Sequence, residues 1–230
     1  MTDDLEAAKE RAWLQLARID ADLARGRIDE YGWHAAVLAI VQPAYLSSAD
    51  PRAQSGLSGD ARHWRYARQL LIEALPGDCC LLDVGCANGH LMNSLVDWAK
   101  EIGTAVEPYG VEISAALADL ARRRCPQWAS RIWTANVLGW RPPMRFDVVR
   151  TGLEYVPPGR QADLLDHLIE HVVGPGGRLV IGVFNEERDA DVLEAEVGSW
   201  GYAVAGHAAR PHRHPSLAYK TFWLDSSRDG

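Results

Sequence analysis

Hydrophobic and polar residues follow two different patterns along this chain, and the pattern changes near residue 76. Before that point, apolar residues recur every three or four positions, which is the spacing of one face of an α-helix. This spacing predicts helices over residues 3–25, 29–41 and 60–75. Because proline cannot continue a helix, we expect the second helix to end before Pro43 and the third before Pro76. Residues 1–76 are therefore predicted to form a helical cap.

Beyond residue 76, short apolar runs alternate with amphipathic segments. The apolar runs predict strands at Cys80–Val84, Tyr109–Ile113, Arg131–Ala135, Asp147–Arg150 and Arg178–Phe184. The segments between and after them predict helices at Gly89–Ile102, Ser114–Arg124, Arg160–Val173 and Glu187–Ser199. Alternating strands and helices imply a parallel sheet covered on both faces.

Two further apolar runs, Tyr202–His207 and Ala218–Leu224, have only a short span between them. Without a crossover helix they are expected to pair as an antiparallel hairpin. The sequence thus predicts an α/β fold with a seven-stranded sheet, in which five parallel strands are followed by a terminal antiparallel hairpin. We expect the boundary between the cap, residues 1–76, and this second domain, residues 77–230, to fall at the change of pattern.

Composition narrows the class of protein. The chain has 230 residues, 47% hydrophobic and 24% charged, as expected of one compact domain with an appended segment. Its formal net charge of −7 gives no overall positive field for binding a nucleic-acid backbone. The start Met-Thr-Asp-Asp is not a signal peptide, and no run of eighteen uncharged apolar residues occurs. We therefore expect a cytoplasmic protein without a membrane span.

Cysteine usage supports the same expectation. The four cysteines, at positions 79, 80, 86 and 125, are too few and too irregularly spaced for a secreted disulfide framework. No Cys-x-x-Cys pair indicates structural zinc. Histidines and arginines gather between His207 and His214, but they lack the spacing of a metal site, so a solvated loop is favoured. No metal is expected.

The segment Leu81–Leu91 carries the informative motif, a hydrophobic strand followed by a turn of small residues and a helix. Gly85 and Gly89 let the backbone turn tightly and let a ligand approach the main-chain N–H groups. A dinucleotide-binding turn has a third glycine where this chain has His90, so pyrophosphate binding is disfavoured. Glu112 follows 23 residues after Gly89, at the end of the next predicted strand. A carboxylate there can bind both hydroxyls of a ribose, which indicates a nucleoside in the ligand.

These motifs, in this order, resemble those of the class I S-adenosylmethionine-dependent methyltransferases. Asp83, Gly85, Ala87 and Gly89 match the first motif of that family, with alanine in place of its middle glycine. The resemblance covers roughly residues 79–225. It implies a three-layer α/β/α, Rossmann-like fold and S-adenosylmethionine as cofactor, which methyl transfer converts to S-adenosylhomocysteine.

The resemblance also implies roles for single residues. Asp83 is expected near the methionine amino group, Gly85 behind the cofactor, and Glu112 on the ribose hydroxyls. Ile113 would pack on the adenine face, and the carbonyl oxygen of Asn136 would accept from the adenine amine. Asp83 and Glu112 also have simpler interpretations, as a turn cap and as a strand end before a helix cap. The expected cofactor-binding residues are Asp83, Gly85, Cys86, Ala87, Gly89, Glu112, Ile113, Asn136, Val137 and Arg150.

Catalytic and acceptor-binding candidates lie in two regions. Glu154 and Tyr155, just beyond the fourth strand, are placed to face the methyl group, although an ion pair or core packing explains either equally well. The polar loop Gln54–Asp60 suits a lid that excludes water. Tyr31, His63 and Trp64 are candidate substrate-binding residues, and helix packing is their alternative.

The function expected from these features is methyl transfer to a small-molecule acceptor, with a role in secondary metabolism. The acidic charge and the lack of room for an RNA-binding module favour a small acceptor over nucleic acid. RNA or protein methylation remains an alternative, as does a catalytically inactive protein that binds S-adenosylmethionine or S-adenosylhomocysteine and works through a partner. We expect no membrane partner, and a monomer or a homodimer.

Overall fold

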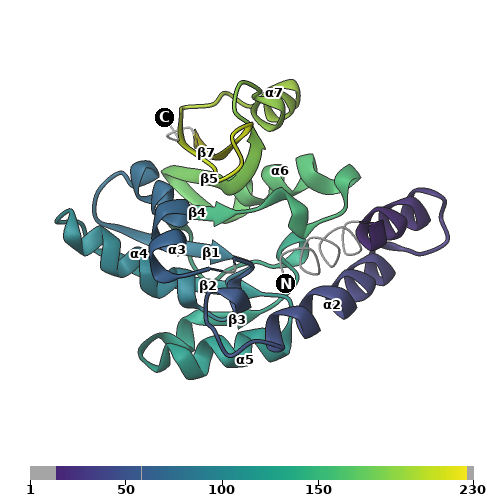
Figure 1. The fold of residues 1–230 in the computed structure, drawn as a ribbon, viewed down its shortest axis with the longest axis horizontal. Coiled ribbons are helices and arrows are strands. Elements are labelled where there is room, and N and C mark those ends of the chain that lie inside the picture. The colour runs from purple at the N-terminus through teal and green to yellow at the C-terminus, as the bar shows by residue number, and fades with distance from the viewer. Residues whose placement is uncertain (1–13, 58, 227–230) are drawn as a thin grey trace.

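The computed structural model describes residues 14–57 and 59–226, and its centre is a seven-stranded sheet (Figure 1). The strand order is β3-β2-β1-β4-β5-β7-β6. All neighbouring pairs from β3 to β5 are parallel, while β7 runs antiparallel to both β5 and β6. The predicted fold class is confirmed. The strands are β1 (Cys79–Val84), β2 (Val106–Glu112), β3 (Ile132–Thr134), β4 (Phe146–Thr151), β5 (Val173–Glu187), β6 (Gly206–Pro211) and β7 (Leu217–Asp225).

Helices connect these strands and form the cap. Residues 14–24 are helical, and Figure 1 shows this helix beside α2, both projecting from the body around the sheet. Most of the predicted helix over residues 3–25 lies outside the described residues. No helix in the described ranges is long and apolar enough to cross a bilayer. The remaining helices are α2 (Glu30–Leu46), α3 (Ala61–Arg68), α4 (His90–Glu101), α5 (Ala115–Arg124), α6 (Gln161–His171) and α7 (Val192–Ser199).

Two predicted helix boundaries are wrong. α2 continues through Pro43 to Leu46. Proline removes one N–H from the last turn, but the carbonyl of Pro43 still accepts from the Ser47 N–H at 2.9 Å, which completes that turn. The helix predicted over residues 60–75 divides into α3 and a 3₁₀ segment, Gln69–Ala74. All of that 3₁₀ segment except Gln69 and Glu73 is buried. Its packing against the sheet therefore determines its backbone conformation.

Alternate residues of the central strands pack into separate cores on the two faces of the sheet. On one face Leu81, Val148 and Val180 contact buried residues of α4 and of the 3₁₀ segment. On the other, Leu82 and Val149 pack with leucines of α6 and with the inner residues of β5 and β7. This period of two is the pattern of strands buried on both faces.

The chain order places a ligand site at one edge of this sheet. From β1 the chain adds β2 and β3 on one side and then returns to place β4 on the other side of β1. The connections after β1 and β4 therefore diverge, and a crevice opens at the carboxyl ends of these strands. In open α/β sheets, ligands bind in such a crevice.

Removing a side chain from the larger core tests its contribution to stability. Leu82 has no solvent-exposed surface, and Leu82→Ala should lower the free energy of unfolding by about 2–5 kcal/mol because it leaves a cavity between the sheet and α6. Denaturant unfolding measures this change. Ile102→Ala, at a position 59% exposed, serves as the control and should change it by less than about 0.5 kcal/mol. A loss below about 1 kcal/mol for Leu82→Ala would contradict the described packing.

Candidate active site

A cavity of about 500 Å³ opens at the carboxyl ends of β1, β2 and β4. Its floor consists of the turn after β1 and the ends of the neighbouring strands, and its roof consists of residues from α2, α3 and the helix over residues 14–24. Ligand pockets in proteins commonly have volumes of this size. The predicted cofactor-binding residues that line it are Asp83, Gly85, Cys86, Ala87, Glu112, Ile113, Asn136, Val137 and Arg150. Gly89 does not line the cavity.

The turn after β1 depends on backbone conformations that favour glycine. Gly85 and Gly89 have φ angles of +70° and +75°. A Cβ atom on Gly85 would lie 2.7 Å from the ring of Tyr155, and one on Gly89 would lie 2.9 Å from the Cys125 sulfur. Ala87 also has a positive φ, +47°, so it adopts the left-handed conformation with the steric penalty of a side chain. The turn therefore keeps a left-handed conformation at Ala87 even though alanine replaces the middle glycine of the motif.

Glu112, at the end of β2, faces this turn. Its carboxylate accepts hydrogen bonds from the Ala87 N–H and the Ser114 N–H, both at 2.9 Å. The residue is 6% exposed, and burial raises the pKa of the carboxyl group while the two backbone N–H groups oppose that rise. Each oxygen has one such bond and a further lone pair. The carboxylate is therefore held rigidly at the cavity wall and can still accept from a ligand.

The predicted residues Asp83, Arg150 and Tyr155 form one buried network at the ends of β1 and β4. Arg150 donates from Nη1 to Asp83 at 3.2 Å and to the Tyr155 hydroxyl at 2.8 Å. Its Nε donates to the Gly182 carbonyl at 2.6 Å. Burial raises the pKa of Asp83, and the Arg150 cation opposes this. Burial also raises the pKa of the Tyr155 phenol, which keeps it protonated. These contacts favour a structural role for Tyr155, as part of the cavity wall, over a role in proton abstraction.

Glu154, the other predicted catalytic residue, has a different environment. It is solvent-exposed and lines the cavity. No hydrogen bond or ion pair to its carboxylate occurs in the described part of the chain. The carboxylate is thus available to a ligand, whereas Tyr155 beside it is held by Arg150.

At the opposite end of the cavity, Ile113, Asn136 and Val137 lie where β2 and β3 end. The Asn136 side-chain oxygen accepts from the Leu138 N–H at 3.1 Å and caps a short 3₁₀ turn. This bond uses one lone pair of the oxygen that we expected to bind the adenine amine. The second lone pair is still free to accept a hydrogen bond.

The cap is joined to the cofactor turn by side-chain hydrogen bonds to Asn88, which is fully buried. Asn88 Nδ2 donates to the Pro51 carbonyl at 2.8 Å and to Gln54 at 3.1 Å, and its Oδ1 accepts from the Ser55 hydroxyl at 2.6 Å. The loop over residues 51–55 is therefore fixed to the turn that forms the cavity floor. A second link runs from the Ser114 hydroxyl to Gln42 of α2, at 2.6 Å.

The three predicted substrate-binding residues have separate positions. Trp64 is buried, lines the cavity and donates from its indole N–H to Ser94 at 2.9 Å. His63 does not line the cavity and forms a hydrogen bond with Tyr219 at 2.9 Å. Tyr31 is 83% exposed and does not line it either. The structure therefore places Trp64 at the cavity, whereas His63 and Tyr31 lie outside its lining.

His34 and Arg68 are among the cavity-lining residues of the cap that were not predicted from the sequence. His34, on α2, is 8% exposed. Arg68, the last residue of α3, donates to the Val183 carbonyl at 3.0 Å and lies over the Trp64 ring. Burial and the nearby Arg150 cation lower the pKa of Arg68, and none of the described carboxylates forms an ion pair with it. An unpaired, desolvated cation of this kind is a site for an anionic group.

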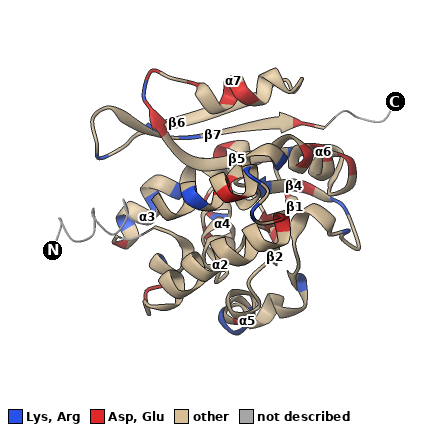
Figure 2. Ribbon diagram, turned by 90° about the vertical axis from the view of Figure 1, so that its right-hand side faces the viewer, with Lys and Arg blue, Asp and Glu red and all other residues tan. Residues whose placement is uncertain are grey.

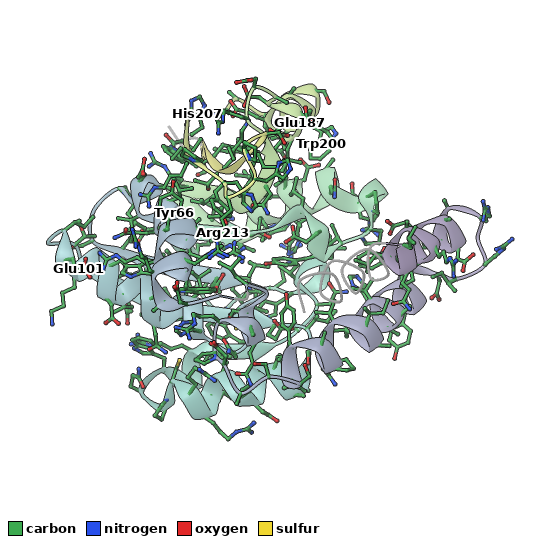
Figure 3. All side chains as sticks on the ribbon, in the orientation of Figure 1. Tyr66, Glu101, Glu187, Trp200, His207 and Arg213 are labelled. Atoms are coloured by element: carbon green, nitrogen blue, oxygen red, sulfur yellow. The ribbon has the colours of Figure 1, made fainter. Side chains whose placement is uncertain are left out.

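The histidine and arginine cluster near the end of the chain is not part of the cavity. His207 Nδ1 lies 3.5 Å from the carboxylate of Glu194, on α7. Figure 3 shows His207 well apart from Arg213. The ring nitrogens of His212 and His214 accept hydrogen bonds within their own turn. Within the ranges that the structure describes, no group of three or more His, Cys, Asp or Glu side chains could hold a metal ion.

The sheet order and the cavity at its switch point define a doubly wound α/β protein with a cavity beside the turn after β1, where such folds bind their ligands. A family model described as a methyltransferase domain matches residues 49–221. The chain belongs to this methyltransferase-domain family, which confirms the resemblance noted in the sequence. No curated protein matches the chain.

Solved structures show the same fold. The N-methyltransferase NodS from Bradyrhizobium japonicum WM9, in complex with S-adenosyl-L-homocysteine, matches at 16% identity and a TM-score of 0.60, over 81% of this chain and 96% of that one. A Burkholderia thailandensis 1,6-didemethyltoxoflavin-N1-methyltransferase matches at 16% identity and 0.63, over 87% and 91%. The [4+2]-cyclase SpnF matches at 13% identity and 0.58, over 83% and 93%. At these identities the likeness shows the fold alone.

The contact between the cap and α4 is expected to weaken in acid. The His90 ring lies 4.8 Å from the Trp64 ring, and burial, with Arg124 and Arg52 nearby, lowers the pKa of His90 to about 4. In the unfolded chain this pKa is near 6.5. The unfolded state therefore binds a proton first, and stability is lost as the pH falls from about 6.5 towards 4. His90→Phe keeps an aromatic ring and should show a smaller fall in Tm over that range. Equal falls in both proteins would contradict this environment for His90.

Proposed function

We propose that this protein transfers a methyl group from S-adenosylmethionine to a small-molecule acceptor and releases S-adenosylhomocysteine. The observation that carries the proposal is the placement of Glu112. Its buried carboxylate lies at the end of β2 and is bonded to the Ala87 N–H of the turn after β1, inside the same cavity. A carboxylate at this place suits the two hydroxyls of a ribose. The family match and the S-adenosylhomocysteine bound to NodS support the same cofactor.

The cavity residues fit the separate parts of that cofactor. Ile113 and Asn136 suit the adenine, and Glu112 suits the ribose. Gly85 lines the cavity at the turn after β1, next to the buried ring of Tyr155, and this part of the wall suits the methionine chain. Arg68, a cation without a carboxylate partner in the described residues, suits the methionine carboxylate. When bound, S-adenosylmethionine supplies an electrophilic methyl group on sulfur.

A small acceptor is favoured by the shape of the site. Cofactor and acceptor have to share about 500 Å³ beneath a roof of helices, which leaves little room for a macromolecule. Figure 2 shows acidic residues interspersed with basic ones over the elements, and the net charge is −7, so nucleic acid is disfavoured. Two of the structural neighbours are N-methyltransferases. By this proposal the described part of the helical cap, within residues 14–57 and 59–76, encloses the acceptor, and the protein acts in secondary metabolism in the cytoplasm.

A second candidate function has one observation in its favour. The [4+2]-cyclase SpnF shares the fold, so a protein of this architecture is not restricted to methyl transfer. In that case the chain would bind the cofactor and act without turning it over. Calorimetry with S-adenosylhomocysteine, followed by incubation with methyl-labelled S-adenosylmethionine and a panel of amines, phenols and heterocycles, separates the two. Binding with label transfer supports the methyltransferase, binding without transfer supports the second candidate, and no binding rejects both.

Glu112→Gln should weaken S-adenosylhomocysteine binding by about 1.5–3 kcal/mol, or roughly 10- to 150-fold, since a hydrogen bond to a charged group is lost. Glu107→Gln, on the same strand but exposed, is the matched control and should bind as the wild type does. Calorimetry measures both affinities. An unchanged affinity in Glu112→Gln would place the ribose elsewhere.

Arg68 gives a test of how the cofactor is oriented. Arg68→Met should weaken binding of S-adenosylhomocysteine by roughly 10-fold or more, because a charge-assisted hydrogen bond is removed. It should leave the affinity for 5′-methylthioadenosine unchanged, because that compound lacks the amino acid portion. Arg65→Met, an exposed arginine on the same helix, controls for loss of positive charge. Equal weakening for both compounds would argue against a carboxylate contact.

A further inference from the structure

His34 is a buried polar side chain without a partner in the cavity wall. It is 8% exposed and lines the cavity from α2. Its Nε2 atom has no hydrogen-bond partner among the described residues. The other two such atoms belong to Arg52 and Arg124, and neither of these residues lines the cavity. A buried nitrogen without a hydrogen bond is unfavourable unless a ligand completes it.

Many of the residues that line the cavity with His34 are apolar. They include Val37, Leu38 and Val41 of α2 and Val156 and Pro158 of the connection after β4. The part of the cavity that these residues form does not include the residues that fit the cofactor. It therefore has the composition of a subsite for a compact, largely apolar molecule, in which a few polar groups fix the orientation.

The polar groups nearest to this subsite are already engaged or have a different character. The Trp33 indole N–H donates to Asp20 at 2.7 Å, and the Gln161 amide donates to the Leu153 carbonyl at 3.2 Å. Glu154 lines the cavity and has no hydrogen bond or ion pair among the described residues, but it is solvent-exposed. Among the described residues that line the cavity, His34 thus presents a fully buried nitrogen without a hydrogen-bond partner.

Burial favours the neutral form of the His34 ring. Glu30, one turn earlier on α2, is ion-paired with Arg160. Burial lowers the pKa of His34, Arg160 lowers it further, and Glu30 raises it. A neutral imidazole has one unprotonated nitrogen, which accepts hydrogen bonds and protons.

We propose that His34 binds the nucleophilic group of the acceptor. This inference rests on the proposed function. Nε2 accepts a hydrogen bond from an O–H or N–H group of a small, largely apolar acceptor. As the lone pair of that oxygen or nitrogen bonds to the methyl carbon, the electrons of the carbon–sulfur bond remain on sulfur, and the acceptor's proton passes to Nε2. Solvent then removes it. Asp20 and Glu154, two of the carboxylates that line the cavity, disfavour an anionic acceptor.

Phenol and anisole are suitable probes because they differ only in whether the oxygen carries a hydrogen or a methyl group. Both are titrated into the protein saturated with S-adenosylhomocysteine, and binding is followed by NMR. Wild type should prefer phenol by about 3- to 10-fold, the effect of one hydrogen bond. Phenol, but not anisole, should shift the ¹⁵N resonance of His34 Nε2, which is assigned as the signal missing from His34→Phe.

Three variants test the role of the histidine. His34→Phe should remove the preference for phenol, and His34→Gln, which keeps an acceptor atom, should restore part of it. Val37→Ala, in the same wall, should weaken phenol and anisole equally. A preference that persists in His34→Phe would overturn the inference, as would the absence of any preference or of any binding in the wild type.

The affinity for S-adenosylhomocysteine is measured first in each protein. This measurement distinguishes failure of the proposed function from failure of the proposed role of His34. The affinity should be the same in wild type and in all three variants. Failure of the wild type to bind S-adenosylhomocysteine rejects the proposed function. Normal binding of S-adenosylhomocysteine with no dependence of phenol binding on His34 rejects only the role of His34.

Discussion

The carboxylate of Glu112 is the interaction on which the geometry of the site depends. It joins the end of β2 to the turn after β1 through the Ala87 N–H, and to the start of α5 through the Ser114 N–H. Both bonds are buried, where a hydrogen bond to a charged group is strong and an unpaired carboxylate would be very unfavourable. The turn, the strand end and the helix start therefore hold one another in place, and the remaining lone pairs of the carboxylate face the cavity.

The cap and the other end of the cavity are built on this frame. Asn88, in the same turn, binds the loop over residues 51–55, and Ser114 binds α2 through Gln42. The roof of the cavity is consequently attached to the residues that form its floor. At the ends of β1 and β4, the Arg150 cation is paired with Asp83 in a network that includes Tyr155, whereas Arg68 has no carboxylate partner among the described residues. This difference favours Arg68 as the group that receives an anion.

The sequence predicted the sheet and its cofactor turn because both have strong local signals. The strands are apolar runs of the right length. Gly85 and Gly89 stand at positions with positive φ, and Glu112 stands at the end of the next strand. The cap was harder to predict because apolar residues occupy most sides of α2, so their spacing does not identify the buried face. Tyr31 was selected as a large aromatic residue, whereas Trp33 and His34 are the ones turned inward. No sequence motif distinguished Arg68 from the other arginines. Its importance comes from the absence of a carboxylate partner among the described residues, which only the fold reveals.

A crystal structure of the complex with S-adenosylhomocysteine would show whether Glu112 binds the ribose. We expect ribose hydroxyls within hydrogen-bond distance of both Glu112 oxygens, the cofactor carboxylate at Arg68, and the sulfur facing the wall that carries His34. A ligand bound outside this cavity, or a ribose directed away from Glu112, would contradict this expectation.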